Sequence, residues 1–528
     1  MLLLTAEAMR ALDRATIEAG HARGIDLMLR AGAGVATAIE RRYGSLLGLR
    51  SLVLCGTGNN GGDGFVAAAH LARRGAQVQV AIAGERARKA GDAAQALASL
   101  EAGGIEAASA PDEHALRAIV SRFDRWDLAV DALLGTGARG EPQGVVAAAV
   151  RLLCDVAGAG TRTVAVDLPT GVDADTGEVR GPAVPADLTV TFGAPKRGHL
   201  LWPGRGFVGA LEVVDIGLVS GDPESQDYRV RVSTGAELSR FVPRRDPRAH
   251  KGTSGRVLVI GGSAGLTGAV ALAAHAATRA GAGYVQVAVP SSLESTLAAK
   301  LTEEMAIGCP ETAERAFAPA TIERLEPYVA RAHALAIGSG LGRHPESLAV
   351  ARRLAIECPR PAVLDADGLN AFAGRAGELS RAAGPRVLTP HVGEMSRLTG
   401  ETAEALERRR IDAPREWAAR WNAVVVFKGA PTVTAAPDGR VWVNGTGGPA
   451  LATAGTGDVL TGIVVALLGQ GVAPFEAGAL AAHVHGAAGD AIGERRGVLG
   501  MAASDLHDEL PRVLGVLARL RDAGTRGS

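Results

Sequence analysis

Residues 51–84 read SLVLCGTGNNGGDGFVAAAHLARRGAQVQVAIAG, and this stretch decides the fold class. Its apolar run 51–56 predicts a strand, and after a glycine-rich loop the run 65–75 predicts a helix that ends at glycine. The run 76–84 then predicts the next strand. Apolar strands that alternate with helices indicate a parallel sheet covered by helices on both faces. The stretch therefore predicts an α/β protein.

The same pattern continues along the first half of the chain. Three further apolar runs end in loops that contain Gly, Pro or Asp, and they span residues 127–137, 161–173 and 186–198. Ligands of such sheets bind at the carboxyl ends of the strands. We therefore expect these loops to converge on one pocket.

A change of character near the middle of the chain predicts two domains. With 528 residues the chain is too long for one hydrophobic core. The segment 218–250 is charged and has little periodicity, and an apolar run at 255–262 then restarts the α/β pattern. We predict one domain over residues 1–225 and another over residues 226–528.

Composition excludes several classes of partner. The 56 basic and 56 acidic residues give a net charge of zero, so nothing electrostatic favours nucleic acid or an anionic membrane. The four cysteines are far apart, which argues against a disulfide framework or a zinc site. The first 20 residues predict an amphipathic helix, with Met9, Leu12 and Ile17 on one side. The apolar stretch 462–484 is broken by glycine and proline, which favours two buried helices over a membrane span. We expect a cytoplasmic protein.

The opening glycine-rich loop carries a mixed signal. Gly56, Gly58 and Gly61 fit the G-x-G-x-x-G spacing that is typical of a dinucleotide site. Asp63, however, places a negative charge where a pyrophosphate would lie, and the spacing leaves Asn59 unexplained. A dehydrogenase fingerprint alone does not account for this loop.

Oxygen-bearing side chains follow neighbouring strands of the first half. Asn60, Asp131 and Thr170 each stand at a predicted strand end and could together bind a hard, weakly held cation. Taken singly, each is better explained by hydrogen bonds to its own turn.

The sharpest motif of the second half is G-T-G-D before a predicted helix over 459–468. Gly455 and Gly457 precede that helix, and Asp458 stands at its N-terminus. Free N–H groups there can hold an anion, and the carboxylate can take a proton from a hydroxyl, which suits phosphoryl transfer. The alternative is an aspartate that only caps a structural helix.

Other loops of the second half place this motif in context. They are VIGGSAGLTGA (259–269), AIGSGLG (336–342), LDADGLNAF (364–372) with Asp365, Asp367 and Asn370, LTPHVGEMSRLTG (388–400) with His391 and Glu394, and VVVFKGAPTV (424–433) with Lys428 and Thr432. In this order, residues 229–520 resemble the ribokinase-like superfamily and, more narrowly, the ADP- or ATP-dependent NAD(P)H-hydrate dehydratases.

This resemblance implies a substrate site and a nucleotide site. The hydrated nicotinamide nucleotide would contact Ala269, Gly340, His391 and Asp458. The adenine nucleotide, ADP or ATP, would contact Lys428, Gly429, Ala430, Pro431, Thr432 and Gly457, with magnesium as cofactor. Val392 replaces the usual proline, and the stretch 444–455 varies a commoner asparagine–proline version. Neither departure removes a reacting group.

The motifs of the first half have a resemblance of their own. NNGGDG, DALLGTG, DLPTGVDADTG and TFGAPKRG are similar to those of NAD(P)H-hydrate epimerases over about residues 6–220. The implied substrate contacts are Asn59, Asn60, Gly61, Gly62, Asp63, Gly135, Thr136, Gly137, Ala138, Arg139, Gly140, Glu141 and Asp167. Potassium would be bound by Asn60, Asp131 and Thr170, the last replacing the usual serine.

As a whole, the chain resembles the bifunctional NAD(P)H-hydrate repair enzymes. This implies a Rossmann-like doubly wound domain that interconverts the R and S forms of NADHX and NADPHX, with Asp167 as acid and base and Lys196 neutralising a phosphate. It also implies a ribokinase-like domain that dehydrates the S form with Asp458 as base, releasing phosphate and, from ADP, AMP. The resemblance further suggests a homo-oligomer.

Two alternatives stay open. The second half could be an ordinary kinase for a vitamin-like alcohol, because the G-T-G-D loop serves that superfamily broadly. The first half could be a non-catalytic ligand-binding or scaffold domain.

Overall fold

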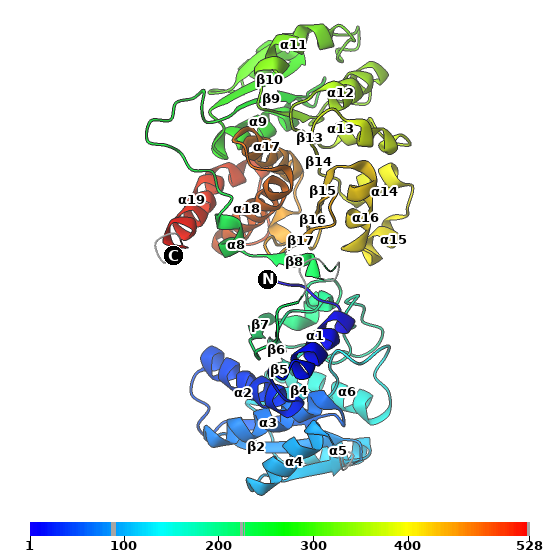
Figure 1. Cartoon of the computed structure of the whole chain (residues 1–528), viewed down its shortest axis with the longest axis vertical. Coiled ribbons are helices and arrows are strands. Elements are labelled where there is room, and N and C mark those ends of the chain that lie inside the picture. The colour runs from blue at the N-terminus through cyan, green and yellow to red at the C-terminus, as the bar shows by residue number, and fades with distance from the viewer. Residues whose placement is uncertain (86–90, 222–224, 226–227, 525–528) are drawn as a thin grey trace. The chain divides into compact units, whose positions relative to one another are not determined.

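The computed structural model describes residues 1–85, 91–221, 225 and 228–524 (Figure 1). The chain divides into two compact units, Met1–Arg229 and Val230–Ser528, here called the first and the second unit. This division falls a few residues beyond the boundary expected at 225 and 226.

Among the described residues, the first unit contains a seven-stranded parallel sheet in the order β3-β2-β1-β4-β5-β6-β7. Its strands are β1 Arg50–Cys55, β2 Gln77–Ala83, β3 Ala107–Ala110, β4 Leu128–Ala132, β5 Arg162–Val166, β6 Leu188–Phe192 and β7 Ala210–Val214. The order reverses between β1 and β4. Such a switch point is where doubly wound sheets bind ligands, because the loops after the two strands diverge there.

Helices cover both faces of this sheet. They are α1 Ala6–Glu18, α2 Gly24–Tyr43, α3 Asn59–Arg73, α4 Asp92–Ala102, α5 Glu113–Val120, α6 Gly144–Gly158 and α7 Arg205–Val208. Val53 of β1 packs with residues of α2, α3 and α4, whereas its neighbours Leu52 and Leu54 pack with residues of α5 and α6. The alternation of side chains along the strand thus supplies two apolar cores.

Helix α3 begins at Asn59, six residues before the start predicted from the sequence. Glycine-rich stretches have low helix propensity, so the sequence favours a loop here. The glycines serve close packing instead. A Cβ at Gly56 would overlap the carbonyl oxygen of Leu133, and a Cβ at Gly61 would overlap that of Gly56. The Asn59–Gly64 stretch therefore forms the first turns of a helix pressed against two strand ends.

In the described part of the second unit, ten strands form one sheet in the order β11-β10-β9-β12-β13-β14-β15-β16-β17-β8. The strands are β8 Val230–Ser233, β9 Arg256–Ile260, β10 Tyr284–Pro290, β11 Met305–Cys309, β12 Ala334–Ile337, β13 Ala362–Leu364, β14 Arg386–Leu388, β15 Val424–Phe427, β16 Val433–Ala435 and β17 Val441–Asn444. Strands β11 to β15 are parallel, and β15, β16 and β17 are antiparallel.

The helices of the second unit include α17, which is buried along almost its whole length. The helix bounds are α8 Gly235–Ser239, α9 Thr267–Arg279, α10 Glu294–Ala298, α11 Thr321–Arg331, α12 Pro345–Glu357, α13 Asp367–Asn370, α14 Val392–Thr399, α15 Ala403–Arg408, α16 Asp412–Trp421, α17 Thr456–Gly469, α18 Pro474–Arg496 and α19 Leu506–Gly524. Helix α17 begins three residues before the predicted start, so Asp458 lies within its first turn.

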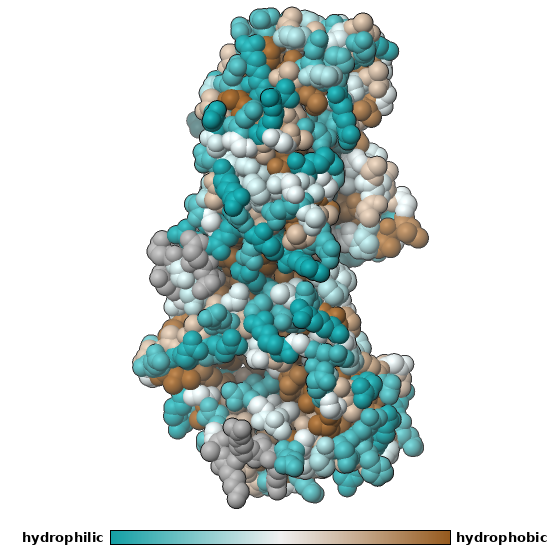
Figure 2. All heavy atoms as spheres, turned by 90° about the vertical axis from the view of Figure 1, so that its right-hand side faces the viewer, coloured by the Kyte–Doolittle hydropathy of each residue, from teal (hydrophilic) through white to brown (hydrophobic). Residues whose placement is uncertain are grey.

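The apolar stretch 462–484 forms parts of α17 and α18, as predicted, and not one continuous helix. In the chain as described, none of the helices combines the length and the apolar character that a bilayer crossing needs. Figure 2 shows hydrophilic and hydrophobic side chains interspersed over one face of the molecule.

Candidate functional site

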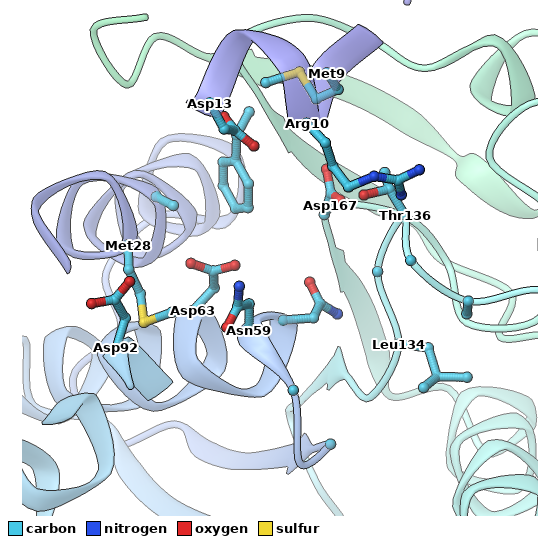
Figure 3. A pocket seen from close by; sticks show the side chains of 18 of the residues that line it. Met9, Arg10, Asp13, Met28, Asn59, Asp63, Asp92, Leu134, Thr136 and Asp167 are labelled. Carbon is cyan, nitrogen blue, oxygen red and sulfur yellow. The ribbon is translucent and has the colours of Figure 1, made fainter. Parts of the chain in front are cut away.

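The first unit contains a cavity of about 630 Å³ at the carboxyl ends of β1 and β4 (Figure 3). The loops after these two strands line it, together with side chains from α1 and α2. The predicted substrate residues that line it are Asn59, Asn60, Asp63, Gly135, Thr136, Gly137, Ala138 and Asp167. Loops from different strands therefore converge as the sequence indicated.

Other predicted substrate residues are absent from the cavity lining: Gly61, Gly62, Arg139, Gly140 and Glu141. Gly61 and Gly62 are buried within α3, and a Cβ at Gly62 would crowd the side chain of Met28. The Arg139 guanidinium pairs with Asp175 at 2.6 Å and with Asp173 at 3.3 Å. In this structure, Arg139 and the two glycines have structural partners.

A buried ion pair forms one wall of the cavity. Nζ of Lys196 donates to Oδ1 of Asp167 at 2.6 Å, to the hydroxyl of Thr191 at 2.8 Å and to the carbonyl of Phe192 at 3.2 Å. A lysine ammonium has three donors, and all three are used within the protein. The three donors of Lys196 are thus used within the protein, and the expectation that this lysine neutralises a phosphate stays a prediction.

The backbone at Asp167 is held in an uncommon conformation. Its φ is 65°, in the left-handed region that few residues other than glycine adopt. The imidazole of His199 supports it by donating from Nε2 to the Asp167 carbonyl at 2.8 Å, while Nδ1 accepts from the Lys196 N–H at 2.9 Å. Burial lowers the pKa of His199 to about 4, so this histidine is neutral and acts as a positioning group.

Three carboxyl groups of the cavity differ in protonation. Burial opposes ionisation of Asp167, but the charge and hydrogen bond of Lys196 outweigh it and lower the pKa of this carboxyl. Burial and the charge of Asp167 raise the pKa of Asp63 well above its usual value. Burial also raises the pKa of Asp13. An ionised and a protonated carboxyl thus share one cavity, an arrangement suited to proton transfer.

The predicted potassium ligands lie close to the cavity. The Thr170 hydroxyl donates to Oδ1 of Asp131 at 2.7 Å, and the Thr170 N–H donates to Oδ2 at 2.8 Å. Burial raises the pKa of Asp131 to about 6. Within the described residues, both polar atoms of the buried Asn60 amide lack a hydrogen-bond partner. A buried carboxylate and an unused amide oxygen are the donors that a hard cation requires.

Sequence reasoning did not assign α1 to the site. Helix α1 begins after Thr5, whose hydroxyl accepts from the Ala8 N–H at 3.1 Å, and it places Met9, Arg10 and Asp13 in the cavity lining. The available signal was a carboxylate one helical turn after the buried Met9. A carboxylate on the inward side of an amphipathic helix indicates a partner or a function.

A second constellation lies in the second unit, after β13 and β15. Nζ of Lys428 donates to Oδ1 of Asp365 at 2.7 Å and lies 3.7 Å from Oε2 of Glu394. The hydroxyl of Thr461 on α17 donates to Oδ2 of Asp365 at 2.8 Å. Asp365 thus connects the loop after β13 with the lysine after β15 and with α17.

Asp458 lies beside this constellation. Burial, followed by the charge of Asp365, raises the pKa of the Asp458 carboxyl to about 6. The preceding residue, Gly457, is also close, because a Cβ there would lie 3.3 Å from Nζ of Lys428. A carboxyl with this pKa can accept a proton near neutral pH.

The remaining predicted substrate residues of the second unit lie in two places. The side chain of His391 caps α14, since its Nδ1 accepts from the N–H groups of Gly393 at 3.0 Å and of Glu394 at 3.3 Å. Its Nε2 lies 3.5 Å from Oε1 of Glu394. A Cβ at Gly340 would lie 3.2 Å from that of Ala269, so these two residues are neighbours.

The predicted nucleotide residues Gly429 to Thr432 form one turn after β15. The Thr432 hydroxyl donates to the Gly429 carbonyl at 3.1 Å. The buried Arg410 supports the turn by donating to the Pro431 carbonyl at 2.9 Å. Lys428 points inward to Asp365, whereas Gly429 and Ala430 are exposed.

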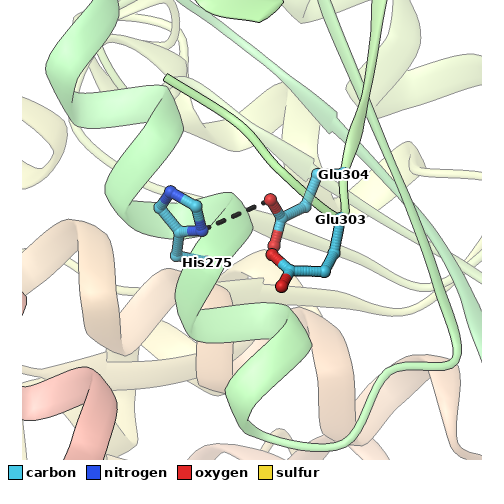
Figure 4. A group of neighbouring side chains, drawn as sticks. All are labelled: His275, Glu303 and Glu304. Carbon is cyan, nitrogen blue, oxygen red and sulfur yellow. Dashed lines mark ion pairs between the residues drawn. The ribbon is translucent and has the colours of Figure 1, made fainter. Parts of the chain in front are cut away.

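His275, Glu303 and Glu304 form another group of ionisable residues in the second unit (Figure 4). Nδ1 of His275 lies 3.3 Å from Oε2 of the buried Glu304, whose Oε1 accepts from the Thr278 hydroxyl at 2.5 Å. The hydrogen bond to Glu304 raises the pKa of His275, and the pKa of Glu304 is lowered despite its burial. These shifts describe an ion pair that ties α9 to the segment before β11.

Two family models match the chain. Residues 257–512 match a model described as NAD(P)H-hydrate dehydratase, and residues 24–198 match one described as YjeF-related protein N-terminus. A solved NAD(P)H-hydrate dehydratase from Bacillus subtilis, co-crystallised with ATP and Mg²⁺, is 31% identical with a TM-score of 0.46, covering 55% of this chain and 99% of its own. The predicted fold class of two α/β domains is confirmed by the two sheets, which are largely parallel, and by the two family models, one on each unit.

Relatives match over both units. A bifunctional NAD(P)H-hydrate repair enzyme from Moorella thermoacetica is 44% identical over 516 residues, covering 97% of each chain. One from Escherichia coli is 34% identical over 492 residues, covering 93% of this chain and 89% of its own. With such identity over nearly the full length, this chain belongs to the family of bifunctional NAD(P)H-hydrate repair enzymes.

Proposed function

We propose that this chain repairs hydrated NADH and NADPH in two steps. Residues 1–225 would interconvert the R and S forms, and residues 226–528 would dehydrate the S form with consumption of a nucleotide. The observation that carries the proposal is that each unit of this chain holds an aspartate whose protonation state suits its own step. An ionised Asp167 lines the cavity of the first unit, and Asp458, whose pKa is raised to about 6, lies at the N-terminus of α17 in the second.

In the first unit, the substrate would lie in the cavity beside α3. The first N–H groups of a helix lack partners within it and favour anions, so the N-terminus of α3 suits the substrate pyrophosphate. The loop Gly135 to Ala138 lies across from it, and a Cβ at Gly135 would lie 3.3 Å from Asn60. We assign the lining residues Asn59, Asn60, Asp63, Gly135, Thr136, Gly137, Ala138 and Asp167 to the substrate.

Epimerisation would be a proton-transfer reaction without a redox step. Hydration leaves a hydroxyl on the carbon next to the ring nitrogen, and such a carbon can lose and regain its configuration. Asp167 is suited to take a proton, because Lys196 keeps its carboxylate ionised. The buried Lys196 also fixes the orientation of the Asp167 carboxylate, which preserves the geometry of the proton transfer.

Potassium would be held by Asn60, Asp131 and Thr170. The unpartnered Asn60 amide and the buried Asp131 carboxyl support this assignment. When bound, the cation would supply a fixed positive charge that keeps Asp131 ionised and orders the loop after β4. Thr170 retains the hydroxyl of the serine that is usual in the family.

In the second unit, Asp458 would remove the proton of the hydroxyl group of the S isomer. The oxygen of that hydroxyl group would attack the terminal phosphoryl group of the nucleotide. AMP leaves if the donor is ADP. The ring nitrogen lone pair then expels phosphate, and loss of a proton from the adjacent ring carbon regenerates NAD(P)H. Hydroxide leaves poorly and phosphate leaves well, which explains why a dehydration would consume a nucleotide.

The surroundings of Asp458 would hold the two ligands together. Ala269, Gly340 and His391 are assigned to the hydrated nicotinamide, and Lys428 to Thr432 with Gly457 are assigned to the nucleotide, ADP or ATP. Asp365, Glu394 and Asp458 outnumber Lys428 around this point, an excess of negative charge that suits Mg²⁺. Magnesium would offset the charge of the transferring phosphoryl group.

The alternative, a vitamin kinase joined to a non-catalytic scaffold, is not favoured, because the relatives that match both units are named as bifunctional repair enzymes. The test supplies the R and S isomers separately, with and without ADP or ATP, and follows the reduced nicotinamide absorbance. Repair of both isomers with nucleotide supports the proposal. A stable phosphorylated product would identify a kinase. A homo-oligomeric state remains a prediction.

A further inference from the structure

The cavity of the first unit receives a carboxylate that belongs to none of the sequence motifs. Asp13 lies on α1 and lines the cavity together with Asp63 of α3 and Asp167 of the loop after β5. Figure 3 shows the three carboxyl groups reaching the same space from these three elements, with open space between Asp13 and Asp167. The substrate cavity therefore has acidic groups on more than one side.

These three groups differ in their partners. Asp167 has a lysine at 2.6 Å. Asp13 and Asp63 make no hydrogen bond and no ion pair through their side chains in the part of the chain that the structure describes. An unpaired carboxyl in a half-buried position is costly to ionise, so it is retained as a neutral acid or for a function.

We propose that Asp13 is the proton donor of the epimerisation and that it acts together with Asp167 as proton acceptor on the other face of the ring. The inference rests on the proposed epimerase function and adds a second catalytic residue to it.

The step balances in atoms and electrons. Asp13 gives its proton to the substrate hydroxyl, the carbon–oxygen bond breaks and water leaves. The lone pair of the ring nitrogen forms a double bond to the same carbon, which gives a planar cation. A water molecule then adds from the opposite face, and Asp167 takes one of its protons. One proton leaves the protein, one enters it, and no oxidant or reductant is required.

The charges around the two groups favour this division of roles. Asp13 faces Lys196, Asp167, Asp63 and Arg14, and burial outweighs the cations among them to raise its pKa. Lys196 lowers the pKa of Asp167. Once Asp13 has given up its proton, its carboxylate also stabilises the cationic ring, because its charge is negative where positive charge develops.

Asp63 is the other candidate for the donor, but its setting is less suitable. Its pKa is raised well above the usual value, and an acid held that firmly protonated is a weak donor near neutral pH. The charges of Asp13 and Asp167 both act on Asp63. The starting protonation states of Asp13 and Asp167 are restored by proton exchange with solvent.

The test uses the full-length protein without nucleotide, so that only epimerisation occurs. Purified R isomer is incubated with Asp13→Asn, with Asp13→Glu and with the matched control Glu18→Gln, an exposed acid on the same helix. Chromatography measures the R-to-S rate above the spontaneous rate, across a range of pH and in isotopically labelled water. Nucleotide-dependent dehydration of the S isomer is then measured in each variant.

We expect Asp13→Asn to lower kcat by about a hundredfold, with little change in KM and with loss of the fall in rate at high pH. Asp13→Glu should recover part of the rate, and Glu18→Gln should match the wild type. The wild-type product should carry the label in its hydroxyl.

Three outcomes would overturn the inference. The first is an Asp13→Asn variant that epimerises at the wild-type rate. The second is a slower variant with an unchanged pH profile and no recovery by glutamate, which would indicate a structural role. The third is a product without label, which excludes departure of water. A wild-type protein that does not accelerate epimerisation at all would instead contradict the proposed function itself.

Discussion

Nζ of Lys196 lies 2.6 Å from Oδ1 of Asp167, and both side chains are almost fully buried at the wall of the cavity. The pair fixes the protonation state of Asp167, and it does so at a backbone position with a φ of 65°. Charge and conformation at this residue are therefore set by the same small group of neighbours.

Replacing Lys196 by methionine should remove epimerisation and destabilise the first unit. A buried carboxylate without its partner costs about 3–5 kcal/mol, although protonation of Asp167 relieves part of this. Urea unfolding followed at Trp126 or Trp202 measures the loss. The double variant Lys196→Met with Asp167→Asn should regain stability and no activity. Equal instability of the single and double variants would show that the ion pair is unimportant for stability.

The stabilisation by this pair should depend on pH in a defined direction. The folded-state pKa of Asp167 is lower than its unfolded value, so the contribution is present above about pH 4 and is lost as the pH falls through the folded-state pKa. Acid unfolding of wild type and of Lys196→Met should therefore converge at low pH. Curves that stay parallel down to the lowest pH would contradict the assigned ion pair.

Asp458→Asn should abolish nucleotide-dependent dehydration and leave epimerisation unchanged. Because burial raises the pKa of Asp458 to about 6, the wild-type dehydration rate should rise with pH through this value as the base becomes deprotonated. The measurement is the pH dependence of kcat/KM for the S isomer. Asp438→Asn, at an exposed turn, serves as the control. Dehydration retained in Asp458→Asn would rule out this residue as the base.

Removing potassium should weaken only the first activity. Burial raises the pKa of Asp131 to about 6, and protons therefore compete with the cation, so the apparent potassium affinity should fall as the pH drops below that value. Thr170→Val should raise the potassium concentration needed for half-maximal epimerisation, whereas Thr170→Ser should not. Equal potassium dependence of the three proteins would exclude Thr170 as a ligand.

The ion pair of His275 and Glu304 should stabilise the second unit over a limited pH range. The pKa of His275 is raised, so its contribution is present below about pH 6.5 and is lost as the pH rises through the folded-state pKa. The pKa of Glu304 is lowered, so its contribution is lost only as the pH falls through its own folded-state value. His275→Ala should lower the free energy of unfolding by about 1–3 kcal/mol near pH 5 and by less near pH 9. A loss independent of pH would indicate packing alone.

Much of the architecture was predictable from the sequence because several strands, such as β1, β5, β12 and β13, are short apolar runs followed by a glycine or aspartate. The break between α17 and α18 was also predictable, because Gly469, Gly471 and Pro474 interrupt the apolar run. The start of α3 was not, because the glycines that disfavour a helix locally are required by close contacts with Leu133 and Gly56. Tertiary packing here overrides intrinsic propensity.

The site was predictable as far as its motifs extend. Asp167 and Lys428 stand in recognisable loops, but the sequence does not reveal that Lys196 is bound to Asp167 or that Lys428 is bound to Asp365. These partners are distant in sequence and meet only through the strand order of the sheets. Asp13 has no motif, and only the packing of α1 over the cavity brings it to the site.

The central claim, that one chain carries two successive activities, is tested most directly by complementation. Purified R isomer with ADP or ATP and Mg²⁺ is given to Asp167→Asn, to Asp458→Asn, and to an equal mixture of both variants. We predict that neither variant alone forms reduced nicotinamide faster than spontaneous epimerisation allows, and that the mixture does. A mixture no faster than Asp167→Asn alone would contradict the account.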